Sequence, residues 1–330
     1  METQRKNMRT PQMKSLVSDL DYYAEAYRSY AGFYSHKIKL YQKWADDVFL
    51  PIAGEKLQES FQGEQEFRIL GIGSGGGEID VCLLERLSAR FSCINNTVVE
   101  PATDAISKYN ALLGEKATSL PGVTTHLKQT TIEEFCAETR ENSSSSDSRP
   151  KFHLIHAISS LYHVDDFKKV IREMYEMLEE GGVMLIIVMT DDHVIYRMWD
   201  NFPFLVGQQQ EALAKNLSSK DITTALEDLG IAYSLQTVNC RTDAISCFNP
   251  ESVEGGKVLD FLTNTIRFRD TAPAEMCDEV LGFLRVICSD ASGSDGGAKE
   301  ELKEGVPKEK DHRDNELRFN RDWQSVIVFR

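Results

Sequence analysis

Apolar and polar positions alternate in blocks along the first 190 residues, and the blocks predict strands and helices in turn. The run 152–158 is predicted to be a buried strand, and the run 183–189 is almost wholly apolar, which is typical of strands buried on both faces of a parallel sheet. The repeated order of strand and helix predicts a doubly wound α/β fold. The predicted strands are 67–73, 97–100, 123–127, 152–158 and 183–189, and the predicted helices are 78–85, 103–113 and 165–178.

The segments on either side of this block are mostly helical in pattern. Between residues 18 and 48, Tyr23, Tyr27, Tyr30 and Tyr34 recur on one helical face. Gly32 weakens that helix, and Pro51 is predicted to end it or to start another. Helices are also predicted at 219–229, 257–268 and 274–289, and strands at 231–238 and 323–329.

The stretch 291–316 is rich in Gly, Ser, Lys, Glu and Asp and has few apolar residues. Such a composition cannot bury enough apolar surface to fold. Because the apolar strand 323–329 follows it, the stretch is predicted to be a mobile surface insertion and not a tail.

Charge and cysteine usage exclude several classes of partner. The formal net charge of −15 argues against nucleic acid. No run approaches the ~18–20 apolar residues of a membrane span, and no apolar core of a signal peptide follows the N-terminus. The seven cysteines are scattered without a C-x-x-C pair, which predicts reduced thiols, no metal and a cytoplasmic protein.

A glycine-rich segment, Leu-Gly-Ile-Gly-Ser-Gly-Gly-Gly-Glu at 70–78, joins a predicted strand to a predicted helix. Glycines at such a junction let the backbone turn sharply and approach a ligand closely. The alternative is a tight turn that binds nothing. Gly71, Gly73 and Gly76 also satisfy G-x-G-x-x-G, so the spacing by itself does not exclude a dinucleotide.

Glu100 ends the next predicted strand, where an acid can accept hydrogen bonds from both ribose hydroxyls of a nucleoside. Glu78 stands at the start of the following helix, where it would repel the pyrophosphate of a dinucleotide. The cationic sulfonium of S-adenosylmethionine tolerates that acid better. The pattern therefore favours S-adenosylmethionine, and a dinucleotide-dependent oxidoreductase remains the alternative.

Several segments together resemble the histamine N-methyltransferase family. They are 72–80, 93–101, 152–164, 184–188, 260–263 and 272–273, and the similarity runs from about residue 15 to residue 328. The resemblance implies a Rossmann-like methyltransferase fold, with a seven-stranded, mostly parallel sheet covered by helices on both faces. It also implies a small substrate-covering region, a cytosolic monomer, and methyl transfer from S-adenosylmethionine to an imidazole nitrogen.

The resemblance and the patterns divide the chain into six segments. Residues 1–14 are expected to be disordered, 15–64 to form a helical substrate-covering segment and 65–190 the S-adenosylmethionine-binding core. Residues 191–290 supply further covering helices and core elements, 291–316 the mobile insert and 317–330 the final core strand.

The cofactor positions carry over with one change. The resemblance implies that Gly73 and Glu100 hold the methionine and ribose portions, with Thr131 and Ile158 near the adenine, and Gly71 and Gly75 of the glycine-rich segment are also expected to bind the cofactor. Where the family has a cofactor-contacting glutamine, this chain has Ala105.

The substrate positions depart further. His36 replaces the family's amine-binding glutamate, Ser159 its imidazole-contacting glutamine, His163 the pocket aromatic beyond Tyr162, and Arg321 an asparagine before the last strand. The retained aromatic residues are Tyr23, Tyr27, Tyr30, Trp199 and Phe261.

These changes remove an acid and add a cation, so we hypothesise an acceptor that carries a carboxylate, such as histidine or carnosine. Arg321 would bind the carboxylate, assisted by His36, and His163 or His36 would accept the acceptor's proton. The alternatives are that Arg321 faces solvent or pairs with an acid, and that the tyrosines are ordinary core. Histamine itself as the acceptor, or a cofactor-binding relative without activity, also stays open.

Overall fold

The structure is a computed structural model that describes residues 13–32, 37–142, 149–207, 216–290 and 317–330. Tyr34, His36, the insert 291–316 and most of the predicted disordered N-terminus lie outside these residues. The chain divides into two compact units. Unit 1 comprises Met1–Ser35, Asp192–Leu213 and Cys240–Arg321, and unit 2 comprises His36–Asp191, Ala214–Asn239 and Asp322–Arg330.

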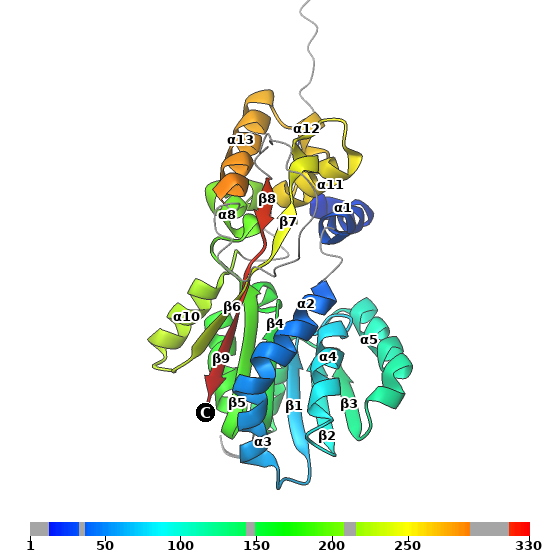
Figure 1. Ribbon diagram of the computed structural model, residues 1–330, viewed down its shortest axis with the longest axis vertical. Coiled ribbons are helices and arrows are strands. Elements are labelled where there is room, and N and C mark those ends of the chain that lie inside the picture. The colour runs from blue at the N-terminus through cyan, green and yellow to red at the C-terminus, as the bar shows by residue number, and fades with distance from the viewer. Residues whose placement is uncertain (1–12, 33–36, 143–148, 208–215, 291–316) are drawn as a thin grey trace, which may run out of the picture. The chain divides into compact units, whose positions relative to one another are not determined.

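Unit 2 is built on a seven-stranded sheet in the order β3-β2-β1-β4-β5-β9-β6 (Figure 1). Only β9 runs against its neighbours, since it pairs antiparallel with both β5 and β6. The strands are β1 (Phe67–Ile72), β2 (Ile94–Val99), β3 (Val123–Lys128), β4 (Phe152–Ile158), β5 (Leu178–Met189), β6 (Ser234–Val238) and β9 (Trp323–Phe329). The predicted fold, a mostly parallel Rossmann-like sheet, is confirmed.

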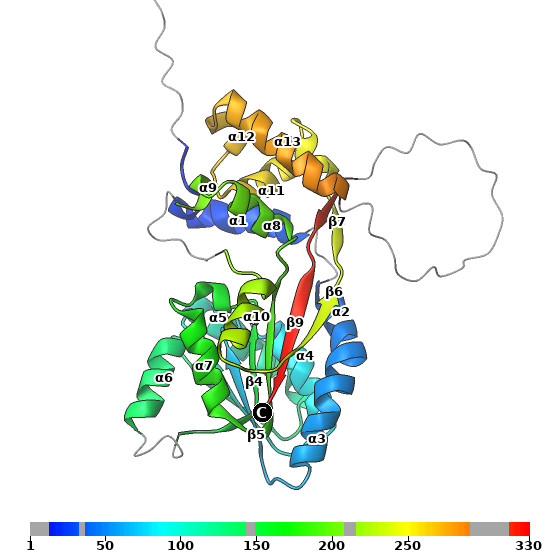
Figure 2. The same cartoon turned by 90° about the vertical axis from the view of Figure 1, so that its left-hand side faces the viewer.

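Helices cover both faces of this sheet, with α6, α7 and α10 on one face and α2, α3 and α4 on the other (Figure 2). Each face has its own apolar core, because β4 and β5 send buried side chains in both directions. The helices of unit 2 are α2 (Lys37–Trp44), α3 (Glu55–Phe61), α4 (Glu78–Leu87), α5 (Thr103–Lys116), α6 (Ile132–Glu141), α7 (Phe167–Met177) and α10 (Ser219–Asp228).

Two local predictions need correction. Pro51 does not interrupt the helical path, because the π-helical segment Ala45–Gly54 contains it and leads directly into α3. The wider π turn accommodates a residue that has no N–H to donate. The strand predicted at 183–189 begins earlier, because β5 starts at Leu178, which pairs with Phe152.

Unit 1 is mainly helical. Its helices are α1 (Leu20–Gly32), α8 (Val194–Asn201), α9 (Phe204–Gly207), α11 (Val253–Thr263), α12 (Phe268–Thr271) and α13 (Ala274–Asp290), and β7 (Arg241–Asp243) pairs with β8 (Arg318–Asn320). The buried Asp260 joins three of the helices, because it accepts hydrogen bonds from the Tyr22 hydroxyl (2.6 Å) and from the Arg267 and Phe268 N–H groups. α1 ends at Gly32, where its sequence predicted a weak point.

In the part of the chain that the structure describes, no helix is long and apolar enough to cross a membrane. In the same residues, the side chains of His, Cys, Asp and Glu form no group of three or more that could hold a metal ion.

Candidate active site

The residues predicted to bind the cofactor lie at one edge of the unit 2 sheet. β3, β2, β1 and β4 are parallel neighbours, so the segments that follow them meet at their carboxyl ends. The Gly73 N–H donates to the Val99 carbonyl oxygen over 2.8 Å, and the Glu100 N–H donates to the Lys128 carbonyl oxygen over 3.0 Å. The structure thus brings Gly73 and Glu100 together, as the sequence predicts.

The glycine loop, residues 71–77, requires its glycines for two separate reasons. Gly73, Gly75 and Gly77 have φ values of +64°, +56° and +86°, which lie in the left-handed region that L side chains rarely adopt. A Cβ atom at Gly73 would also lie 2.5 Å from the Ser160 Cβ atom, whereas a Cβ at Gly75 would face open space. The loop is therefore tightly packed at Gly73 and open at Gly75.

Glu100 is held by the backbone around it. One carboxylate oxygen accepts a hydrogen bond from the Gly75 N–H (2.9 Å) and the other from the Ala102 N–H (3.0 Å). The residue is only 8% exposed. Each carboxylate oxygen can accept more than one hydrogen bond, so the oriented carboxylate can also receive two neighbouring hydroxyl groups.

Thr131 and Ile158 lie at the same edge of the sheet. Thr131 follows β3 and caps α6, because its side chain accepts a hydrogen bond from the Glu134 N–H over 3.2 Å. The Thr131 N–H in turn donates to the Glu134 carboxylate over 3.1 Å, which completes a capping box. Ile158 is the last residue of β4 and is buried.

The segment after β4 contains three predicted substrate residues. Ser159 has a φ of +52°, a strained value for a residue with a side chain. A short 3₁₀ turn, Leu161–His163, follows it and carries Tyr162 and His163, whose ring centroids are 4.4 Å apart. His163 is exposed and Tyr162 partly buried, so both can meet a ligand.

Unit 1 brings together the tyrosines of α1 and Phe261 of α11. The Phe261 ring centroid lies 6.0 Å from that of Tyr23, 5.6 Å from that of Tyr27 and 4.6 Å from that of Tyr30. Tyr30 is buried, but Tyr27 is 44% exposed. The aromatic cluster formed by these four residues therefore has a buried end and an accessible end.

Trp199 of α8 is fixed against the same helix as Phe261. Its indole N–H donates to the Leu262 carbonyl oxygen over 3.1 Å. The side chain is partly buried, so it packs beside α11 and keeps part of its ring surface accessible.

Arg321 does not face solvent, because it is only 6% exposed. Its guanidinium carbon lies 4.0 Å from the Tyr30 ring centroid, and its Nη1 donates to the Tyr30 carbonyl oxygen over 3.1 Å. The pKa of His193 is lowered to about 3, first by burial and second by the positive charge of Arg321. Arg321 is thus a fixed cation at the buried end of the aromatic cluster.

Comparison with known proteins decides the family. A family model for a methyltransferase domain matches residues 38–234. The chain belongs to the methyltransferase family. Histamine N-methyltransferase of Rattus norvegicus is 30% identical over 83% of this chain and 90% of its own length. Carnosine N-methyltransferase 2 of Gallus gallus is 29% identical over 81% of this chain and 79% of its own.

The predicted resemblance to the histamine N-methyltransferase family is therefore confirmed, and the protein is a methyltransferase enzyme. Solved structures resemble it less closely. The YcgJ protein of Bacillus subtilis matches with a TM-score of 0.45 at 14% identity, covering 84% of this chain and 98% of that one. The fold assignment rests on the strand order of the methyltransferase itself.

Three residues of the methyltransferase site have no predicted role. Ser160 fills the space beside Gly73, and its Oγ donates to the Ile72 carbonyl oxygen over 2.7 Å. Asp80 and His156 lie against Gly71. The run 152–158 contains two histidines, His153 and His156, and these were the available signal, since a buried polar side chain needs a partner.

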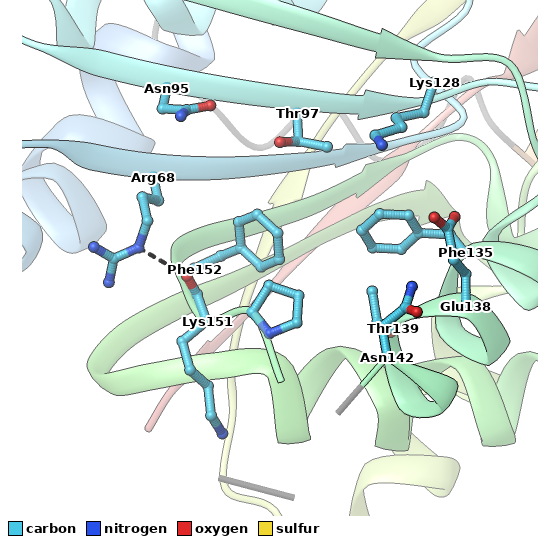
Figure 3. Close-up of a pocket in the computed structure, with 11 residues that line it drawn as sticks. Arg68, Asn95, Thr97, Lys128, Phe135, Glu138, Thr139, Asn142, Lys151 and Phe152 are labelled. Carbon is cyan, nitrogen blue, oxygen red and sulfur yellow. Dashed lines mark hydrogen bonds between the residues drawn. The ribbon is translucent and has the colours of Figure 1, made fainter. Parts of the chain in front are cut away.

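A cavity of ≈ 610 Å³ lies elsewhere in unit 2 (Figure 3). Phe135 and Phe152 face each other across it, and Arg68, Thr97 and Lys128 line its sheet side. It contains none of the predicted cofactor or substrate residues, so it does not mark the site at the glycine loop.

Proposed function

We propose that the protein is an S-adenosylmethionine-dependent N-methyltransferase whose acceptor is a small imidazole or amine that carries a carboxylate. The observation that carries the cofactor assignment is the Glu100 carboxylate, held by the Gly75 and Ala102 N–H groups beside an open loop. That arrangement suits the two ribose hydroxyls of the cofactor.

The fit of the glycine loop also favours S-adenosylmethionine over a dinucleotide. A Cβ atom at Gly76 would lie 2.9 Å from one carboxylate oxygen of Glu78, so this acid folds back over the loop. A pyrophosphate needs N–H donors at this position and would meet a negative charge instead. We propose that Gly71, Gly73, Gly75 and Glu100 hold the methionine and ribose portions, and Thr131 and Ile158 border the adenine.

The acceptor assignment rests on Arg321 and the aromatic cluster. A buried guanidinium presents a planar set of donors that suits a carboxylate, and aromatic faces favour a cationic or imidazole group. Histamine has no carboxylate and carnosine has one, and relatives named for either acceptor are about equally similar to this chain. Sequence similarity alone therefore does not choose between the two acceptors.

When bound, S-adenosylmethionine supplies an activated methyl group that can pass to the lone pair of a nitrogen. The protein's main task is to orient the acceptor nitrogen, because strong acid–base catalysis is not required. We propose that the aromatic cluster and Trp199 give unit 1 an aromatic surface that suits an imidazole or amine. In unit 2, Tyr162 would exclude water, Ser159 would hydrogen-bond to an acceptor, and His163 would accept the proton that the cationic methylated product releases. His36, the other predicted proton acceptor, lies outside the described residues.

The test is methyl transfer from labelled S-adenosylmethionine to a panel of histamine, histidine, carnosine and simple amino acids. We expect label on the carboxylate-bearing imidazoles and little on histamine. Transfer mainly to histamine would overturn the carboxylate assignment and leave the enzyme class intact. Cofactor binding without transfer to any acceptor would favour a binding-only relative.

We propose further that the protein acts as a cytoplasmic monomer. All seven cysteines lie among the described residues and none of them forms a disulfide, which suits a reducing compartment. Light scattering coupled to size-exclusion chromatography tests the monomer directly, and a mass of twice 37.3 kDa would contradict it.

A further inference from the structure

Four buried polar side chains lie beside the glycine loop and take no part in the proposed chemistry. Asp80 comes from α4, Asn96 from β2, Tyr109 from α5 and His156 from β4. Asp80 and His156 are 3% exposed, and Asn96 and Tyr109 are fully buried. We call these four residues the polar quartet.

The members of the polar quartet contact one another. The Tyr109 hydroxyl donates to Asp80 Oδ2 over 3.3 Å, and the Asn96 amide donates to the Tyr109 hydroxyl oxygen over 3.2 Å. His156 Nε2 lies 3.8 Å from the same Asp80 oxygen. Asp80 and Tyr109 thus connect three consecutive elements, α4, β2 and α5, with the more distant β4.

The polar quartet also contacts the glycine loop at both of its ends. A Cβ atom at Gly71 would lie 2.9 Å from His156 Cε1 and 3.0 Å from Asp80 Oδ2. A Cβ atom at Gly77 would lie 2.6 Å from the Tyr109 ring. Between these two supported ends stands Gly75, whose N–H binds Glu100.

Stability alone is a poor explanation for the polar quartet. Burying polar groups costs free energy that their hydrogen bonds return only in part. Burial also raises the pKa of the Asp80 carboxyl, an effect that His156 opposes. Apolar side chains of similar volume are often equally stable or better in such positions, and the surrounding core is apolar.

We propose that the polar quartet positions the glycine loop for cofactor binding, an inference that rests on the proposed function. His156 and Asp80 fix the backbone at Gly71, and Tyr109 fixes it at Gly77. The Gly75 N–H is thereby kept where it orients the Glu100 carboxylate. The four side chains are positioning residues, because they act through the loop and through Glu100.

The variants that test this are Tyr109→Phe, Asp80→Asn and His156→Gln. Tyr109→Phe removes only a hydroxyl and keeps the ring against Gly77, so it is the variant least able to disturb folding. The matched control is His153→Gln, because His153 is a second buried histidine of β4 that accepts a hydrogen bond from the Arg68 N–H. His153 stacks on Phe61, with ring centroids 4.1 Å apart, near the amino end of β4, whereas the glycine loop follows the carboxyl end of β1.

We expect each quartet variant to raise the dissociation constant of S-adenosylhomocysteine and the KM for S-adenosylmethionine about tenfold. The value of kcat at saturating cofactor should stay unchanged, because the loop still reaches its bound geometry. His153→Gln should lower thermal stability and leave both constants unchanged. Quartet variants that behave like this control would overturn the inference.

A second readout does not depend on activity. In the ligand-free protein, the N–H groups of Gly73, Gly75 and Gly77 are all hydrogen-bonded. Their hydrogen exchange should become about tenfold faster in the quartet variants and not in His153→Gln. If the wild type bound no cofactor, the proposed function would fail, and the exchange rates alone would decide this inference. Unchanged exchange would then overturn it.

Discussion

Gly73 and Ser160 are packed so closely that a Cβ atom at position 73 would lie 2.5 Å from the Ser160 Cβ atom. Rotation of the Ser160 side chain cannot relieve this overlap, because turning about the Cα–Cβ bond leaves the Cβ atom in place, and the Oγ is itself held by donation to the Ile72 carbonyl oxygen. Gly73→Ala should therefore cost about 1–2 kcal/mol for the left-handed backbone, and about 1–3 kcal/mol more for the overlap. Denaturant unfolding measures this loss, and cofactor affinity should fall with it.

A double-mutant cycle separates the two contributions. In a Ser160→Gly background the overlap is gone, so Gly73→Ala should cost only the backbone part. Additive effects of the two substitutions would show that the side-chain contact is not what excludes alanine.

Ser159→Gly should stabilise the protein slightly, by about 0.5 kcal/mol, and should raise the KM for the acceptor. Glycine relieves the φ of +52°, although its greater freedom in the unfolded chain offsets part of the gain. The matched control is Asn264→Gly, since Asn264 has a φ of +51° at the end of α11. A KM that changes equally in both variants would remove Ser159 from the acceptor site.

Arg321→Lys should weaken binding of a carboxylate-bearing acceptor about tenfold and leave histamine unaffected. Lysine keeps the positive charge but loses the planar donors and the stacking on Tyr30. The measurement is kcat/KM for both acceptors. Arg285→Lys is the control, because its guanidinium carbon lies 4.7 Å from the Phe248 ring in the same unit. Equal losses on both acceptors would mean that Arg321 only supports the fold.

His153 should make the protein sensitive to acid. Burial, and secondarily the charge of Arg68, lower the pKa of His153 from 6.5 to about 4. The folded state keeps the imidazole neutral, whereas the unfolded chain binds a proton below pH 6.5. This contribution to stability is therefore fully present above pH 6.5 and is lost as the pH falls toward 4, by up to about 3 kcal/mol.

Urea unfolding as a function of pH tests this expectation. The free energy of unfolding of His153→Gln should fall less steeply between pH 6.5 and 4 than that of the wild type. His126→Gln, at an exposed position of β3, should keep the wild-type slope. A wild-type slope in His153→Gln would assign the acid sensitivity to other groups.

The sequence predicted the sheet well because strands and glycine turns are local signals. The run 152–158 has five apolar residues among its seven, and β4 spans the same residues. The final strand, Trp323–Phe329, was likewise marked by its own side chains. The glycine loop and Glu100 could be placed at one edge because parallel strands align their carboxyl ends.

The contacts that complete the site could not be predicted because they join distant parts of the chain. Ser160 and Ile72 are 88 positions apart, and Arg321 and Tyr30 are 291 apart. No periodicity links such residues, so the stacking of Arg321 on Tyr30 became visible only in the fold. The polar quartet is hidden for the same reason, since its four members come from four elements.

The most direct test of the central claim is calorimetric titration of the purified protein with S-adenosylmethionine, S-adenosylhomocysteine and NAD⁺. We expect both adenosyl compounds to bind, NAD⁺ not to bind, and Glu100→Gln to weaken S-adenosylhomocysteine at least about tenfold. Binding of NAD⁺ in preference to S-adenosylmethionine, or equal affinity in Glu100→Gln, would contradict the cofactor site described for the glycine loop.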